Sequence, residues 1–205
     1  MKRIGIFGGS FNPIHLGHTA LAAYICEQEL VDEVWLMVSP QNPLKQNRAL
    51  LNEAERLAMA RLATAPYPML RACDFEFTLP RPSYTYHTLQ ALRKAYPDCE
   101  FSLIIGEDNW QCFDHWYRGE DIARETPIIV YPRGSESSAL SELDGEFSTF
   151  NFQLSILKTP PLLPYSSTEV REYIAAGKDF GHMLHPDVTR YIKENNLYIT
   201  QHDEA

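Results

Sequence analysis

Short apolar runs alternate along this chain with longer segments in which apolar residues recur every three or four positions. Ile4, Ile6 and Phe7 form the first run, which glycines and Asn12-Pro13 end. Runs of this length between turn residues predict buried strands. The strands expected on this basis are residues 4–7, 31–38, 101–106, 126–133 and 155–159.

Helical spacing fills most of the chain between these strands. In residues 50–65, for example, Ala54, Leu57 and Ala58 are spaced for one face of a helix. The predicted helices are residues 15–29, 50–65, 83–96, 166–177 and 185–198, with a short helix and a loop over 108–116. Since strands alternate with helices, the pattern predicts an α/β fold, in which helices cover both faces of a parallel sheet.

Composition fits one globular domain over residues 1–205, with a helical C-terminal portion at about 166–199. The chain has 205 residues, 44% of them hydrophobic, and carries 18 Lys and Arg against 27 Asp and Glu, a net charge of −9. An acidic balance argues against non-specific nucleic-acid binding, which needs surplus cations to replace counterions. A small anionic ligand at one locally positive site is still compatible with this charge.

The chain offers no obvious targeting or membrane segment. No apolar stretch approaches the roughly 20 residues that span a bilayer, and the apolar run after Arg3 is too short for a secretory signal. The four cysteines lie far apart without a CxxC pair, as is typical of reduced thiols. We therefore expect a cytoplasmic protein, with an exposed insertion at the Ser-, Glu- and Gly-rich residues 134–149.

The segment after the first strand, GGSFNPIHLGH at residues 8–18, concentrates candidate chemistry. Ligands of open parallel sheets lie beyond the carboxyl ends of strands, where glycines allow close approach and helix N-termini attract phosphate. His15 and His18 are three residues apart and share a face, and Gly17 leaves room beside them. Two imidazoles suit a phosphate chain or a metal. Because no Asp, Glu or Cys within a turn completes a metal site, phosphate is favoured.

A second polar cluster, SSTEVR at residues 166–171, opens a predicted helix. Its hydroxyl side chains can cap the free N–H groups, and Arg171 lies one turn beyond Thr168 on the same face. A guanidinium there would be a cationic fork for phosphate oxygens. The alternative is an ordinary capping box in which Glu169 or a neighbour reaches back to the cap.

Together these segments resemble the first and second motifs of the nucleotidyltransferase superfamily, (H/T)xGH and (I)SSTxxR. The resemblance implies a Rossmann-like fold of the nucleotidyltransferase type and transfer of AMP or CMP from a nucleoside triphosphate. Two departures are visible: Asn12 stands where many relatives have Asp, and Tyr165 where Ile is usual. Asn retains the turn chemistry and Tyr is expected to pack, so neither changes the expected activity.

The middle of the chain is similar to the bacterial nicotinate mononucleotide adenylyltransferases of the NAD pathway. The resemblance runs from about residue 3 to 199, apart from residues 134–149. The segments that carry it are NPLKQ at 42–46, RPSYTYHTLQALR at 81–93, IIGEDNWQCFDHWYRGEDI at 104–122 and IIVYPR at 128–133.

This resemblance implies catalytic roles for His15, His18 and Arg171. On the ATP side it implies Gly8, Gly9, Ser10, Phe11, His15, His18, Gly106, Asp108, Ser166, Ser167, Thr168 and Arg171. On the nicotinate mononucleotide side it implies Ser10, Lys45, Thr85, Trp116, Tyr117 and Arg133.

Specific contacts follow from the same resemblance. Trp116 would stack on the pyridine ring, and the backbone of Tyr117 would bind its carboxylate. Asp108 would bind ribose hydroxyls of the adenylate side. Lys45 and Arg133 would face phosphates. His87 and His115 lie in neither superfamily motif and are expected to be bystanders.

The reaction implied is transfer of AMP from ATP to nicotinate mononucleotide, giving nicotinate adenine dinucleotide and pyrophosphate in NAD biosynthesis. Mg²⁺ would be bound mainly through the ATP phosphates, without a dedicated protein metal site. The partners expected are ATP and nicotinate mononucleotide, without nucleic acid or membrane, and a homo-oligomer is compatible with the sequence.

Other functions are open at this point. Nicotinamide mononucleotide is the alternative acceptor, and another small adenylyltransferase of the superfamily is the next alternative. Phosphopantetheine adenylyltransferases and glycerol-phosphate cytidylyltransferases share HxGH, but are typically shorter and lack the Ser-Tyr-Thr and Asp-His-Trp segments. Outside this class, a nucleotide sensor would bind ATP without releasing pyrophosphate, and a zinc hydrolase would need a third ligand beside His15 and His18.

Overall fold

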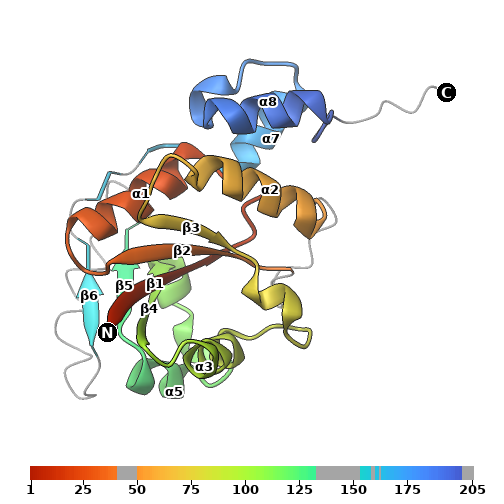
Figure 1. Cartoon of the computed structure of the whole chain (residues 1–205). Coiled ribbons are helices and arrows are strands. Elements are labelled where there is room, and N and C mark those ends of the chain that lie inside the picture. The colour runs from red at the N-terminus through yellow and green to blue at the C-terminus, as the bar shows by residue number, and fades with distance from the viewer. Residues whose placement is uncertain (41–49, 133–152, 158–159, 162, 200–205) are drawn as a thin grey trace.

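The computed structural model describes residues 1–40, 50–132, 153–157, 160–161 and 163–199 (Figure 1). Within these ranges the strands form one six-stranded sheet of order β3-β2-β1-β4-β5-β6, and every neighbouring pair is parallel. The strands are β1 (Lys2–Gly9), β2 (Glu33–Val38), β3 (Leu70–Cys73), β4 (Cys99–Gly106), β5 (Ile128–Tyr131) and β6 (Leu154–Ile156). The prediction of a parallel α/β sheet is confirmed.

The direction of winding changes between β1 and β4. Chain order runs outward from β1 through β2 to β3 on one side and from β4 through β5 to β6 on the other. In such sheets a crevice opens beyond the carboxyl ends of the two central strands. Register pairs Phe7 with Ile104, so Gly9 and Gly106 end neighbouring strands at this edge. The topology therefore places the first motif beside the residues after β4.

Helices cover both faces of the sheet because alternate strand residues point to opposite sides. In β2, Val34 and Leu36 belong to the core under α1 (Leu16–Glu27) and α2 (Glu53–Thr64), and Trp35 and Met37 belong to the opposite core. The opposite core contains residues of α3 (Thr85–Ala95), α4 (Glu107–Trp110) and α5 (Gly119–Glu125). The buried strands are thus apolar on both faces, as the continuous runs predict.

The C-terminal helices α7 (Ser167–Ala175) and α8 (Pro186–Glu194) add a further layer on the α1 and α2 side (Figure 1). Val170, Ile174, Val188 and Ile192 extend the core under α1 and α2. Three short 3₁₀ helices complete the described elements: η1 (Phe75–Thr78), η2 (Phe113–His115) and η4 (Gly181–Met183). No described helix is both long and apolar enough to cross a lipid bilayer.

Four elements escaped the sequence analysis: β3, α5 and the 3₁₀ helices η1 and η4. β3 has only four residues, of which the first and the last are buried, so the segment shows no detectable period of two. α5 has seven residues, and its apolar part is little more than Ile122 and Ala123. Predicted ends also shift by a few residues, which is normal for helix termini. The predicted insertion at 134–149 lies outside the described residues.

Candidate active site

The loop after β1 is built by a close contact between Gly9 and Phe11. A Cβ on Gly9 would lie 3.0 Å from the Phe11 ring, so a larger residue would displace it. Phe11 has a positive φ of 45°, a left-handed conformation that bulky residues rarely adopt and that recurs at functional sites. Its ring is buried and meets the His18 ring edge-on, with centroids 5.0 Å apart. The turn therefore packs directly against one of the two motif histidines.

The rings of His15 and His18 lie against each other at the start of α1, tilted by 31°. Their ring centroids are 3.7 Å apart, and His15 is the N-cap of the helix. The His15 backbone N–H donates to His18 Nδ1 at 3.2 Å. A neutral His18 then carries its hydrogen on Nε2, where it can donate to an oxyanion. A Cβ on Gly17 would lie 3.0 Å from His15 Nδ1, so the room left by Gly17 is taken by the His15 ring itself.

The start of α7 is bonded to this loop. Arg171 Nη1 donates to the Asn12 carbonyl at 2.7 Å, and Ser167 Oγ donates to the Pro13 carbonyl at 2.8 Å. Arg171 Nη2 also donates to Thr168 Oγ1 at 3.2 Å. The bonds to the Asn12 and Pro13 carbonyls join segments more than 150 residues apart in the chain. The two motifs that sequence analysis treated as one polyanion site are therefore adjacent.

The capping interpretation of the second motif also holds for one residue. Ser166 is the N-cap of α7, and its hydroxyl accepts from the Glu169 N–H at 3.1 Å. Ser167 and Thr168 are the first two helical residues and have the different partners given above. The motif thus starts a helix and presents Arg171 at the same end.

Asn12 forms hydrogen bonds with distant parts of the chain, whereas sequence analysis treated it only as a turn residue. It is 2% exposed, and its Oδ1 accepts from the Tyr198 hydroxyl at 2.9 Å and from the Leu51 N–H at 3.3 Å. Burial raises the pKa of Tyr198 far above its ordinary value. Nothing in the polar C-terminal sequence around Tyr198 signals this contact.

Gly106 and Asp108 lie at the neighbouring strand end. Gly106 closes β4 and is the N-cap of α4, and Asp108 is an exposed residue in the first turn of that helix. Gly106, and not Asp108, is therefore the N-cap of this helix. Its carboxylate is placed at the edge of the sheet where the crevice of this topology opens.

Thr85, Trp116 and Tyr117 lie on the other face of the sheet, around α3 and η2. Thr85 is the first residue of α3, whose N-cap is Tyr84. Trp116 is half-buried and packs against Phe113, with centroids 5.2 Å apart. Tyr117 is 48% exposed, and the centroid of its ring lies 4.9 Å from that of Tyr84. This side of the site is therefore lined by aromatic rings.

The histidines expected to be bystanders lie near these rings. His87 is exposed, and its ring lies 5.3 Å from that of Tyr117. His115 is exposed and lies 2.7 Å from its neighbour Asp114. Two predicted phosphate contacts, Lys45 and Arg133, lie outside the described residues.

The carboxyl group of Glu76 is buried beside α3. Glu76 is 7% exposed, and burial raises its pKa despite hydrogen bonds that lower it. Thr88 Oγ1 donates to it at 2.8 Å, and Ser83 Oγ at 3.5 Å. Sequence analysis missed Glu76, because nothing in the sequence marks a single Glu between Phe75 and Phe77 as a residue that tertiary packing will bury.

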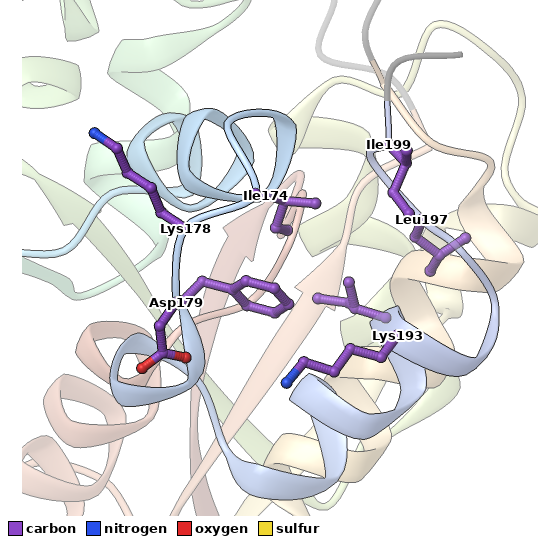
Figure 2. A pocket seen from close by; sticks show the side chains of 9 residues that line it. Ile174, Lys178, Asp179, Lys193, Leu197 and Ile199 are labelled. Carbon is purple, nitrogen blue, oxygen red and sulfur yellow. The ribbon is translucent and has the colours of Figure 1, made fainter. Parts of the chain in front are cut away.

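The described residues contain no group of three or more His, Cys, Asp or Glu side chains suited to a metal ion. In this part of the chain the zinc hydrolase alternative therefore lacks its third ligand. The cavity drawn in Figure 2 lies between α7 and α8, and residues such as Ile174, Phe180 and Ile192 line it. None of the predicted site residues lines that cavity, so it is separate from the motif histidines.

Comparison with known proteins identifies the family of this chain. Residues 6–173 match the model of the family described as Cytidylyltransferase-like. The chain is 48% identical over 190 residues to a "Probable nicotinate-nucleotide adenylyltransferase" of Bacteroides fragilis, covering 93% of this chain and 90% of that protein. A protein of the same description from Bacteroides thetaiotaomicron is 48% identical over 199 residues, covering 97% and 93%.

Solved structures confirm the fold. The Plasmodium falciparum nicotinic acid mononucleotide adenylyltransferase complexed with NaAD superposes with a TM-score of 0.78 at 23% identity, covering 97% of this chain and 98% of that one. The same enzyme complexed with APC gives a TM-score of 0.77 with the same coverage. The family model and the Bacteroides relatives show that the chain belongs to the cytidylyltransferase-like family and, within it, to the nicotinate-nucleotide adenylyltransferases.

Proposed function

We propose that this chain transfers AMP from ATP to nicotinate mononucleotide, forming nicotinate adenine dinucleotide and pyrophosphate. The observation that carries the proposal is the pair of hydrogen bonds from Arg171 and Ser167 to the Asn12 and Pro13 carbonyls. They hold a guanidinium and a helix start beside the His15–His18 pair. This collection of donors and positive charge suits a polyphosphate.

The reaction needs no nucleophile from the protein. An oxygen of the mononucleotide 5′-phosphate forms a bond to the α-phosphorus of ATP, and the bond from that phosphorus to the β-phosphate oxygen breaks. The electron pair leaves with pyrophosphate. The attacking oxygen is already anionic, so no general base is required, and positioning with charge neutralisation supplies the catalysis.

The triphosphate contacts are assigned to the motif residues. His18 donates from Nε2 to the α-phosphate, on which negative charge develops, and His15 holds the adjoining phosphate oxygens. Arg171 and the N–H groups at Thr168 take the β- and γ-phosphates. Gly8, Gly9, Ser10 and Phe11 form the loop along the nucleotide. Asp108 accepts from the ribose hydroxyls near Gly106.

The mononucleotide contacts are assigned to the aromatic side. Trp116 stacks on the electron-poor pyridine ring, with Phe113 supporting its other surface. The backbone at Tyr117 donates to the nicotinate carboxylate, and Thr85 and Ser10 contact the mononucleotide. Lys45 and Arg133 neutralise phosphate charge in the same assignment.

Mg²⁺ fits this donor set only as an ion carried by the nucleotide. The side chains gathered around His18 are imidazoles, hydroxyls and a guanidinium, and this set lacks the carboxylate oxygens by which proteins usually bind Mg²⁺ directly. When bound, Mg²⁺ offsets part of the triphosphate charge.

The four free cysteines support a reducing, cytoplasmic setting for the reaction.

A pyrophosphate-release assay with ATP and each mononucleotide tests the proposal. Release with nicotinate mononucleotide is expected, with slower release for the amide, whose NH₂ donor would face the backbone donors at Tyr117. Faster release with nicotinamide mononucleotide would favour that alternative acceptor. ATP binding without release with either acceptor would instead indicate a nucleotide sensor.

A further inference from the structure

Arg56 on α2 is a buried charge that none of the assigned roles uses. The residue is 1% exposed, yet its guanidinium donates four hydrogen bonds, all to backbone carbonyls. Nη1 bonds the carbonyls of Ser10 at 2.6 Å and Ser39 at 2.8 Å. Nη2 bonds Pro40 at 3.2 Å, and Nε bonds Leu51 at 2.9 Å.

These carbonyls belong to three different segments. Ser10 follows β1, Ser39 and Pro40 follow β2, and Leu51 directly precedes the N-cap of α2. None of the ion pairs found among the described residues includes Arg56. A charge removed from water without a carboxylate partner is unfavourable unless hydrogen bonds satisfy it. Arg56 is therefore held by the shape of this loop junction, and in turn fixes that shape.

The bond to Ser10 is the one that leads to the reaction. A trans peptide directs its carbonyl and its N–H to opposite sides, so bonding the Ser10 carbonyl to Arg56 turns the Phe11 N–H away from Arg56. Phe11 then takes its left-handed conformation, with its ring against His18. One guanidinium thus sets the turn on which the His18 ring rests.

We propose that Arg56 is a positioning residue for AMP transfer, acting through the Ser10–Phe11 turn on His18. The proposal rests on the proposed function above. Arg56 contacts no reacting group in this role. Its effect is to fix the distance and angle of the His18 ring relative to the α-phosphate, so losing it should reduce the rate of the chemical step more than substrate binding.

Arg56→Lys in the full-length chain is the first test. Lysine keeps the charge, but its single ammonium cannot reproduce a fork that reaches three segments. We expect kcat to fall by about 10- to 100-fold, the scale of a misplaced catalytic group. The KM values for ATP and nicotinate mononucleotide should stay within about threefold of wild type. Arg56→Gln, which also removes the charge, should reduce kcat by at least as much.

Arg61→Lys is the matched control. Arg61 lies on the same helix, is exposed and pairs with Asp74 at 3.0 Å. The kcat of Arg61→Lys should equal that of wild type. Histidine ring signals in NMR spectra provide a readout that needs no turnover: the His18 signals should shift in Arg56→Lys and stay in place in Arg61→Lys.

Three results would overturn the proposal. The first is wild-type kcat in both Arg56 variants. The second is activity lost only in proportion to folded protein, as measured by thermal unfolding, which would make Arg56 merely structural. The third is unchanged His18 signals in Arg56→Lys. If the wild-type chain released no pyrophosphate, the proposed function would fall, and the His18 signals would still decide the role of Arg56.

Discussion

The two halves of the proposed site are constructed differently. On the triphosphate side, functional side chains are tied to backbone atoms by hydrogen bonds, as Arg171 is to Asn12 and His18 is to His15. On the mononucleotide side, Trp116 and Tyr117 rest on neighbouring rings. Hydrogen bonds fix position and angle, whereas ring contacts tolerate sliding. The first arrangement suits transition-state charge, and the second suits binding of a flat ring.

His18→Ala should give the largest effect. We expect kcat for pyrophosphate release to fall by about 100-fold or more, the scale of one lost electrostatic donor. The fold should remain, because His18 is not among the buried residues of either core. Exposed His115→Ala is the control and should retain the wild-type rate. A near-normal rate for His18→Ala would refute the assigned mechanism.

Arg171→Ala should produce the next largest change. The KM for ATP should rise by about tenfold or more, since a charge-assisted contact is lost. The thermal unfolding midpoint should also fall, because the Asn12 carbonyl loses a donor. Arg190→Ala, which removes an exposed ion pair with Asp187 on α8, should affect neither quantity. An unchanged KM for ATP would mean that Arg171 does not contact the triphosphate.

Trp116→Ala tests the other half. The KM for nicotinate mononucleotide should rise by about tenfold, the scale of one lost base-stacking contact. The KM for ATP should remain almost unchanged. Steady-state kinetics with each substrate varied in turn would measure both. The reverse pattern would mean that the two halves have been assigned to the wrong substrates.

Tyr198→Phe addresses the support behind the triphosphate side. Losing the hydrogen bond to Asn12 Oδ1 should lower the free energy of unfolding by about 1 kcal/mol, because the acceptor is buried. Tyr191→Phe is the matched control. Its hydroxyl donates to Glu55 in a more accessible place, where water can replace it, so the loss should be smaller. Denaturant unfolding of both variants would measure the two losses in free energy, and equal losses would contradict this prediction.

Glu76 supplies a pH-dependent test on the mononucleotide side. Burial raises its pKa, so the folded state holds the proton more tightly than the unfolded state. Stability from this group is present below the unfolded pKa of about 4.3 and is lost as pH rises through the folded value. As pH rises from acid towards neutrality, the free energy of unfolding of Glu76→Gln should therefore increase relative to that of wild type. A pH-independent difference would contradict the assignment.

Much of the site was predictable because motif residues are close in sequence. His15 and His18 are one turn apart at a helix start, and Arg171 stands one turn beyond Thr168. Periodicity also predicted the strands around them. Residues whose role depends on distant packing escaped, including Arg56, Glu76 and Tyr198. Nothing in the segments around them marks side chains that become buried against carbonyls, hydroxyls or an amide from elsewhere in the fold.

The sequence by itself determined the alternation of strands and helices, the parallel sheet and the two motifs to which phosphate binding is assigned, because these depend on local period and residue chemistry. Tertiary structure decided which loops meet. Only the reversal of strand order at β1 and β4 creates the site edge, and only the return of α7 brings Arg171 to Asn12. Contacts between residues 159 positions apart leave no local signal, since their free energy comes from packing and desolvation that arise once the chain has folded.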